Sequence, residues 1–122
     1  MPPKLYGPGF TWVYNDNHQD ETRITDILFT NSEAGSAGEA VKLSNGRWTK
    51  ASTTDVPGGI LVNNVEAGTD QKCEVILIRP GDQFVVPYTG TPDAGFVPGA
   101  NAVAIGADGL SVDAATVSGG AF

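Results

Sequence analysis

Glycine and proline interrupt this chain so often that few segments are long enough to form a helix. The 122 residues include 16 glycines and 8 prolines, about a fifth of the total. The apolar runs between them have the length of strands, and none shows the 3.6-residue period of an amphipathic helix of ten or more residues. Hydrophobic residues still make up 40% of the chain, which is typical of a folded protein. We therefore predict an all-β domain of short strands and many turns.

The strongest predicted strand spans residues 72–79, with the sequence KCEVILIR. Cys73, Val75 and Leu77 share one face of this strand, and Ile76 and Ile78 lie on the other. Because both faces are apolar, we expect a central strand that is covered on both sides. Further strands are predicted at residues 26–30, 39–43, 47–50, 60–65, 83–88, 102–105 and 110–112.

Two similar hairpins are predicted, in residues 38–51 and 99–114. Their turns contain Asn45-Gly46 and Asp108-Gly109, pairs that readily adopt the positive φ angles of a tight turn. This internal similarity favours a small β-barrel, closed or nearly closed and built from two related halves, or a β-sandwich-like domain. The alternative is that such hairpins recur by chance in a chain rich in turns.

The first 22 residues differ from the rest of the chain. Tyr6, Phe10, Trp12 and Tyr14 lie among glycines and prolines, and a polar segment, NDNHQDE, follows them at positions 15–21. We predict an extended aromatic arm and polar hinge in residues 1–22 and a single β domain in residues 23–122. Aromatic side chains are frequent interface anchors, so these four residues are the candidate interface. The alternative is an edge strand that closes the chain's own core.

Residues suited to catalysis are scarce. The single histidine, His18, lies in the polar hinge, where Asp16, Asp20 and Glu21 are its only acidic neighbours, and a hinge is a poor metal site. The single cysteine, Cys73, has no partner for a nucleophilic pair and is better explained as a core residue. We expect no catalytic residues, no metal and no cofactor, and hence a protein that is not an enzyme.

The charge of the chain limits its partners. Seven basic residues stand against fourteen acidic ones, which gives a net charge of −7, and the basic residues form no cluster. Binding to nucleic acid is therefore not expected. No apolar run approaches the length of a membrane span, and the N-terminus does not resemble a signal peptide. We expect a soluble protein made in the cytoplasm that binds no membrane.

Several short segments occur in a characteristic order along the chain. They are GEAVKL at 38–43, NGRW at 45–48, GGIL at 58–61, RPGDQF at 79–84 and a glycine-rich C-terminus that ends in Phe122. Over residues 35–122 this succession resembles a known family, the capsid decoration (cement) proteins of tailed bacteriophages. It implies a structural protein on the outer surface of the virion that binds the major capsid protein of an expanded head and associates with itself, commonly as a homotrimer. The long aromatic N-terminal extension departs from the shortest members.

A binding module of another class is the alternative function. A carbohydrate- or receptor-binding β domain on a virion or cell surface would need an aromatic platform, and Trp48 and Trp12 are the candidates. Trp48 is predicted to lie on a strand opposite Val41 or Leu43, which favours a place in the core.

Overall fold

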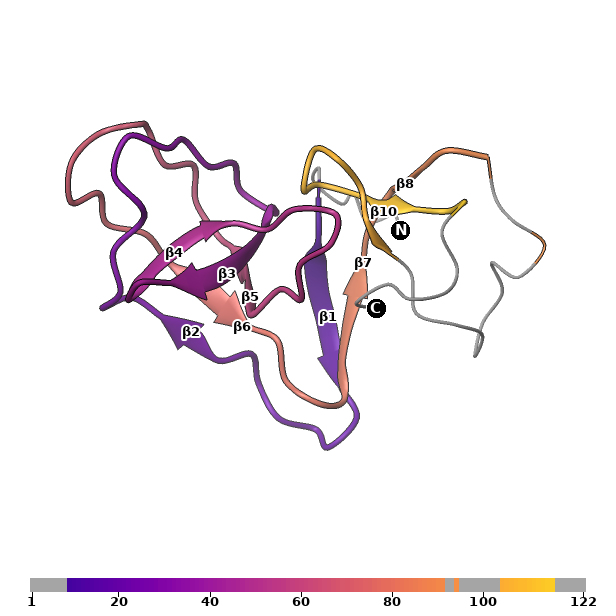
Figure 1. The fold of residues 1–122 in the computed structure, drawn as a ribbon. Helices are drawn as coiled ribbons and strands as arrows, with labels where there is room; N and C mark the ends of the chain where they lie inside the picture. The colour runs from indigo at the N-terminus through magenta and orange to yellow at the C-terminus, as the bar shows by residue number, and fades with distance from the viewer. Residues whose placement is uncertain (1–8, 92–93, 95–103, 116–122) are drawn as a thin grey trace, which may run out of the picture.

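The protein is described by a computed structural model over residues 9–91, 94 and 104–115, in which all regular secondary structure is β (Figure 1). This confirms the predicted all-β class. Ten strands in these residues form three sheets. They are β1 (Thr11–Asn15), β2 (Arg23–Ile24), β3 (Ala40–Ser44), β4 (Arg47–Lys50), β5 (Gly59–Leu61), β6 (Val75–Leu77), β7 (Asp82–Val85), β8 (Tyr88–Thr89), β9 (Ala104–Ile105) and β10 (Val112–Asp113).

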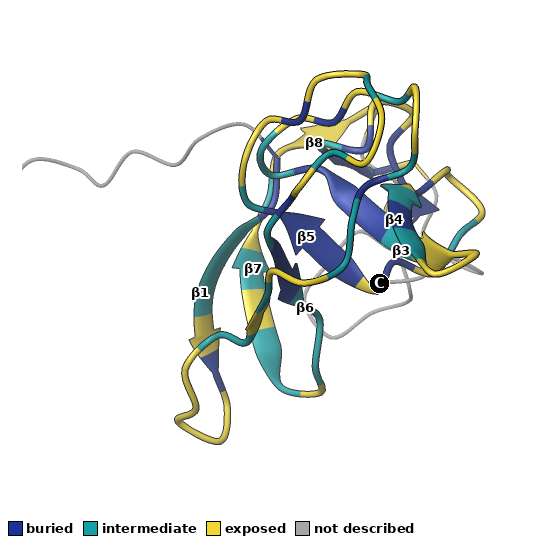
Figure 2. Cartoon of the chain, turned by 90° about the vertical axis from the view of Figure 1, so that its left-hand side faces the viewer, coloured by how far each residue is buried: buried dark blue, intermediate teal, exposed yellow. Residues whose placement is uncertain are grey.

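The largest sheet has five antiparallel strands in the order β2-β6-β5-β3-β4. The predicted strand in residues 72–79 is β6, and its position between β2 and β5 confirms that it is central. Strands β5 and β6 are mostly buried, as Figure 2 shows. Both have only three residues.

Apolar side chains cover both faces of this sheet, because neighbouring residues of a strand point to opposite sides. On β5, Ile60 belongs to one buried cluster and Leu61 to the other. The first cluster consists of Phe29, Val41, Trp48, Leu61, Val65, Cys73 and Val75. The second consists of Phe10, Ala40, Ala51, Ile60, Ile105 and Val112. The fold thus has two apolar layers, one on each side of the central sheet.

The first predicted hairpin, in residues 38–51, is present, and so is the second over residues 104–114; residues 99–103 of that prediction lie outside the described residues. Between β3 and β4, Asn45 and Gly46 have φ angles of 53° and 78°, as a tight turn between antiparallel strands requires. Strands β9 and β10 form the second hairpin, in which Gly109 has a φ of 71°. The backbone carbonyl of Gly109 accepts a hydrogen bond from Ala40 N at 2.9 Å, so this turn is fixed to the central sheet.

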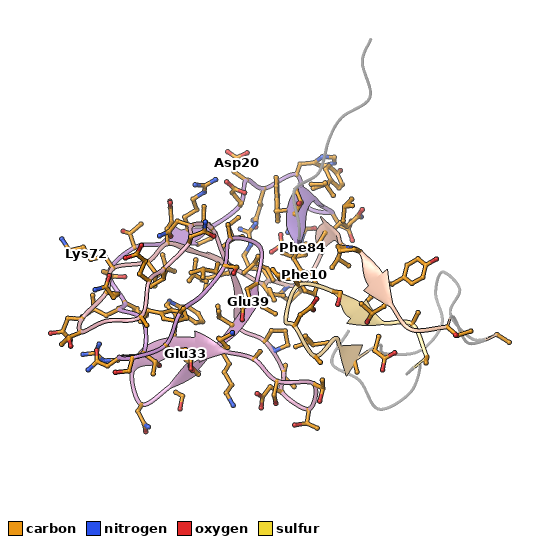
Figure 3. All side chains as sticks on the ribbon, turned by 90° about the horizontal axis from the view of Figure 1, so that it is seen from above. Phe10, Asp20, Glu33, Glu39, Lys72 and Phe84 are labelled. Carbon is orange, nitrogen blue, oxygen red and sulfur yellow. The ribbon has the colours of Figure 1, made fainter. Side chains whose placement is uncertain are left out.

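The predicted closed or nearly closed barrel is wrong for the described residues. Strands β1 and β7 pair with each other alone, and β8, β10 and β9 form a third small sheet. The five-stranded sheet therefore ends at β2 and β4. The β1–β7 pair packs on one face of this sheet through Phe10 and Phe84, which lie side by side with ring centroids 6.3 Å apart (Figure 3). This packing is sandwich-like.

The N-terminal segment is not outside the sheets where the structure describes it. Thr11–Asn15 is strand β1, Phe10 N donates to Gly38 O at 2.8 Å, and the Phe10 side chain is buried. The prediction of an extended arm is therefore wrong for residues 9–14. These residues agree with the alternative, an edge strand that closes the chain's own core. Burial of aromatic surface and pairing with β7 outweigh the local effect of the glycines and prolines. Tyr6 lies outside the described residues. The polar segment after β1 is exposed at positions 16–20, as predicted.

Candidate functional site

The residues considered for catalysis do not form a reactive site in the structure. His18 Nδ1 lies 2.9 Å from Tyr14 Oη on an exposed turn. Cys73 is buried, its Sγ donates to Ile27 O at 3.3 Å, and burial raises the pKa of its thiol, which disfavours the reactive thiolate. Within the described ranges, no group of three or more His, Cys, Asp or Glu residues could hold a metal ion.

A buried carboxylate, Asp82, holds the β1–β7 pair to the rest of the fold. Its side chain is 1% exposed. Oδ1 accepts from Trp12 Nε1 at 3.1 Å, from Asn15 Nδ2 at 2.8 Å and from Arg79 Nη2 at 3.1 Å. Oδ2 accepts from Arg79 N at 2.9 Å and Arg79 Nε at 3.2 Å. Burial alone would raise the pKa of Asp82, but these hydrogen bonds together lower it well below its usual range.

A bulge in β1 decides which aromatic side chains face the interior. The register shifts between Trp12, which pairs with Phe84, and Tyr14, which pairs with Gln83. Paired residues of antiparallel strands point to the same side, and neighbours along a strand point to opposite sides. Trp12 and Phe84 therefore face the central sheet, whereas Tyr14 faces outward. Without the extra residue, Val13, both aromatic residues would lie on one face.

The outward side of the β1–β7 pair carries exposed apolar side chains. Tyr14 is 40% exposed, and Val85, on the same side of the pair, is 38% exposed. Tyr88 follows three residues after Val85, on β8 of the third sheet, and is 56% exposed. We call Tyr14, Val85 and Tyr88 together the ribbon surface. Their backbone is held by the β1–β7 ladder and by the pairing of Tyr88 with Val112, so the ribbon surface is built on regular structure.

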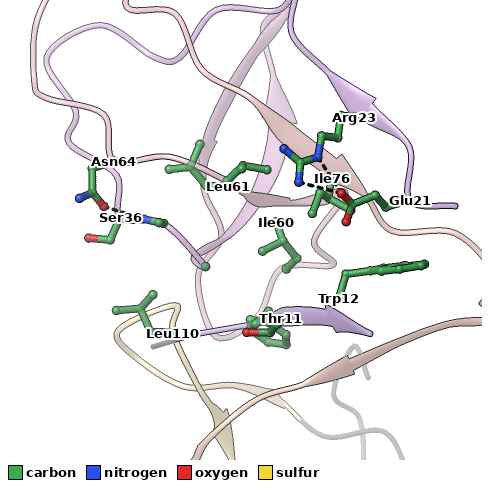
Figure 4. A pocket seen from close by; sticks show the side chains of 14 residues that line it. Thr11, Trp12, Glu21, Arg23, Ser36, Ile60, Leu61, Asn64, Ile76 and Leu110 are labelled. Atoms are coloured by element: carbon green, nitrogen blue, oxygen red, sulfur yellow. Dashed lines mark hydrogen bonds and ion pairs between the residues drawn. The ribbon is translucent and has the colours of Figure 1, made fainter. Parts of the chain in front are cut away.

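On the inward side, a groove of about 720 Å³ separates β1 from the central sheet (Figure 4). Ile60 and Ile76 form its floor, and Trp12 lines the side that belongs to β1. Its other lining residues are Phe10, Thr11, Glu21, Arg23, Ser36, Ala37, Gly38, Leu61, Val62, Asn64 and Leu110. The floor and one wall are thus apolar, and the polar side chains lie along the rim.

The polar rim of this groove is ordered by hydrogen bonds and ion pairs. Arg23 forms an ion pair with Glu21 at 2.7 Å and another with Glu74 at 3.2 Å, and the hydrogen bonds with first Glu21 and then Glu74 raise the pKa of the guanidinium. On the opposite rim, Asn64 Oδ1 accepts from Ala37 N at 2.8 Å. This contact fixes the orientation of the amide, so that the NH₂ group of Asn64 remains available as a donor.

A second buried acid, Glu39, joins three parts of the fold. Its Oε1 accepts from Ser36 N at 3.0 Å, and its Oε2 lies 3.5 Å from Lys50 Nζ. A Cβ added at Gly109 would lie 2.9 Å from Glu39 Cγ, so the β9–β10 turn covers this side chain closely. Burial raises the pKa of Glu39 more than the Ser36 N–H and Lys50 lower it.

The structure separates the residues that the sequence had grouped. Of the four predicted interface residues, Phe10 is in the core, Trp12 lines the groove and Tyr14 is on the ribbon surface. Trp48 is 1% exposed and pairs with Leu43, which confirms its predicted place in the core and removes it as a surface platform. The groove was not predicted, because its walls come from segments far apart in the chain and no local pattern marks them.

Comparisons with protein-family models, with curated proteins and with solved structures find no match to this chain. The parts of the chain that the structure describes contain no helix with the length and hydropathy of a membrane span.

Proposed function

We propose that this protein is a capsid decoration protein, which binds the outside of an expanded bacteriophage head and stabilises the contacts between major capsid subunits. The ribbon surface is the observation that carries the proposal. Tyr14, Val85 and Tyr88 are exposed apolar side chains on paired strands. Exposed apolar side chains on rigid elements lose little conformational freedom on binding, which favours their use as contacts with a partner.

The attachment of the ribbon supports this role. Asp82 connects β1 to the turn before β7, and Phe10 and Phe84 anchor the pair to the core. Because the ribbon surface is fixed to the core, its contacts hold the whole domain on the protein that it binds. Because such a ligand binds the expanded lattice and not the unexpanded one, it stabilises the expanded lattice by mass action, and the effect is repeated over many copies.

The interface assignment changes with the structure. Phe10 is 5% exposed and stabilises the monomer, so it is not proposed as a contact residue. The proposed contacts with capsid or with a neighbouring copy are Tyr14, Val85 and Tyr88, and association into a homotrimer remains part of the proposal. A protein of this kind acts without catalysis, cofactor, nucleic acid or membrane, and it lies on the outer surface of the virion after synthesis in the host cytoplasm.

The test is binding to expanded empty heads. These are assembled from the major capsid protein that is encoded nearest to this gene, and binding of the full chain is measured by co-sedimentation. Stoichiometric binding to expanded heads, with little binding to unexpanded ones, is the expected result. Absence of binding to either form refutes the proposal.

Matched variants locate the contact. Replacing Tyr14, Val85 and Tyr88 by serine is expected to weaken binding at least tenfold, because each buried anchor contributes on the order of 1–3 kcal/mol. The control replaces Leu43 and Val56 by serine, since these residues are 53% and 76% exposed but lie outside the ribbon surface. Equal loss of binding in both variants contradicts the assignment of the contact to the ribbon surface.

A further inference from the structure

The groove between β1 and the central sheet offers a ligand both an aromatic wall and polar partners. Trp12 is partly exposed there, and the bond from its Nε1 to Asp82 fixes the orientation of the ring. Ile60 and Ile76 supply an aliphatic floor. A ring that carries C–H groups on its faces can lie against such a wall, because the electron-rich face of an indole attracts the positive edges of C–H bonds.

The rim presents donors and acceptors together. The carboxylate of Glu21 accepts hydrogen bonds, and the guanidinium of Arg23 and the amide NH₂ of Asn64 donate them. A hydroxyl group is at once a donor and an acceptor, so a ligand with several hydroxyls suits a rim of this composition.

The charges of the groove select against an anionic ligand. Arg23, the one Lys or Arg among the described lining residues, is already paired with Glu21 and Glu74. The chain as a whole has a net charge of −7, which repels anions at long range. Phosphorylated and acidic ligands are therefore expected to bind more weakly than neutral ones.

From these contacts we infer that the groove is a binding site for a neutral saccharide, with Trp12 as the stacking wall and Glu21, Arg23 and Asn64 as the hydroxyl-binding rim. Its volume of about 720 Å³ lies within the range of about 300–1,000 Å³ that is usual for sites of small ligands. This inference is independent of the proposed function, since Tyr14, Val85 and Tyr88 do not line the groove.

The experiment is an NMR titration of the full chain with maltose, cellobiose, N,N′-diacetylchitobiose and lactose. The chain has two tryptophans, and their indole N–H signals report separately on the groove and on the core. Binding is expected to shift the signal of Trp12 and to leave that of Trp48, which is 1% exposed, in place. A heparin disaccharide is the anionic comparison and is expected to bind more weakly.

Two variants test the contacts, and a third is the control. Trp12→Leu removes the aromatic wall, and Asn64→Asp keeps the acceptor for Ala37 N but removes the NH₂ donor. Each is expected to weaken binding at least about tenfold, or about 1.4 kcal/mol. Asn63→Asp makes the same change at the neighbouring position, where Oδ1 accepts from Glu74 N, Nδ2 donates to Asn64 O at 3.2 Å and the side chain does not line the groove. Because the lost bond is to the backbone of Asn64 and not to its side chain, this variant is expected to bind like the unaltered chain.

Two results would overturn the inference. One is that no saccharide of the panel shifts the Trp12 signal at concentrations up to about 20 mM, well above the millimolar Kd of a weak site. The other is that a saccharide binds but Asn64→Asp, shown by its NMR spectrum to be folded, binds it as tightly as Asn63→Asp does. Binding to phage heads is measured separately, so its failure does not affect either result.

Discussion

Replacing Asp82 by asparagine is the most informative perturbation of this fold, because one buried side chain there joins β1, β7 and the turn between β6 and β7. The change preserves the shape of the side chain and removes its charge. The amide oxygen of asparagine can still accept from Trp12, Asn15 and Arg79 Nη2, as Oδ1 does now. Its NH₂ group then faces Arg79 N and Arg79 Nε, which are both donors.

The expected loss of stability follows from these contacts. Two charge-assisted hydrogen bonds disappear, each with a net value of about 1.5–3 kcal/mol. Arg79 keeps its bonds to Thr22 Oγ1 at 2.9 Å and to Asp20 O, and its side chain is 22% exposed, so water solvates part of its charge. We therefore expect a loss of about 3–5 kcal/mol, as for other broken buried ion pairs. This corresponds to a decrease in Tm of roughly 10–20 °C for a domain of this size.

The pH dependence gives an independent test of the same contact. The pKa of Asp82 is lower in the folded than in the unfolded state, so the unfolded state binds more protons in acid. The contribution of Asp82 is complete above about pH 5 and is lost as the pH falls from there toward 2. The Tm of the unaltered chain should therefore decrease over this window more steeply than that of Asp82→Asn. Calorimetry or circular dichroism at a series of pH values measures both curves.

The control for this prediction is Asp55→Asn. Hydrogen bonds from Ser52 N and then Lys42 lower the pKa of Asp55 to about 2, but this side chain is 22% exposed, compared with 1% for Asp82. We expect its removal to change Tm at neutral pH much less than the removal of the Asp82 carboxylate. The reasoning is refuted if both variants have the same Tm, or if Asp82→Asn keeps the acid sensitivity of the unaltered chain.

Three further predictions test the core and the second buried acid. Phe10→Ala should destabilise the chain by about 3–5 kcal/mol, because Phe10 is a core residue, and an unchanged midpoint in chemical denaturation would contradict this. Gly59→Ala should cost about 1–3 kcal/mol, since the added Cβ would lie 2.3 Å from Val75 Cγ1, and a Tm equal to that of the unaltered chain would show that the sheet adapts. Glu39→Gln should gain stability relative to the unaltered chain as the pH rises from about 4 to 7. The pKa of Glu39 is raised in the folded state, so its ionisation opposes folding and the unaltered chain loses stability over this range. Parallel Tm curves of the two chains would refute this.

Local chemistry in the sequence determined the class of fold and several of its parts. Turns such as Asn45-Gly46 depend on φ angles that few residue types adopt, so they can be read without knowledge of the rest of the chain. The central position of residues 72–79 follows from apolar side chains on both faces, which is a property of the segment itself.

Only the tertiary structure decided what the N-terminal aromatic residues do. Phe10 is buried because Phe84 and the central sheet cover it, and Trp12 is oriented by Asp82, 70 positions away in the chain. The bulge at Val13 then turns Tyr14 to the opposite side of the same strand. On a regular strand, Trp12 and Tyr14 would lie on the same face because they are two residues apart. The unpaired residue between them places them on opposite faces. The ribbon surface and the groove both depend on this pairing between distant strands, which no local pattern in the sequence specifies.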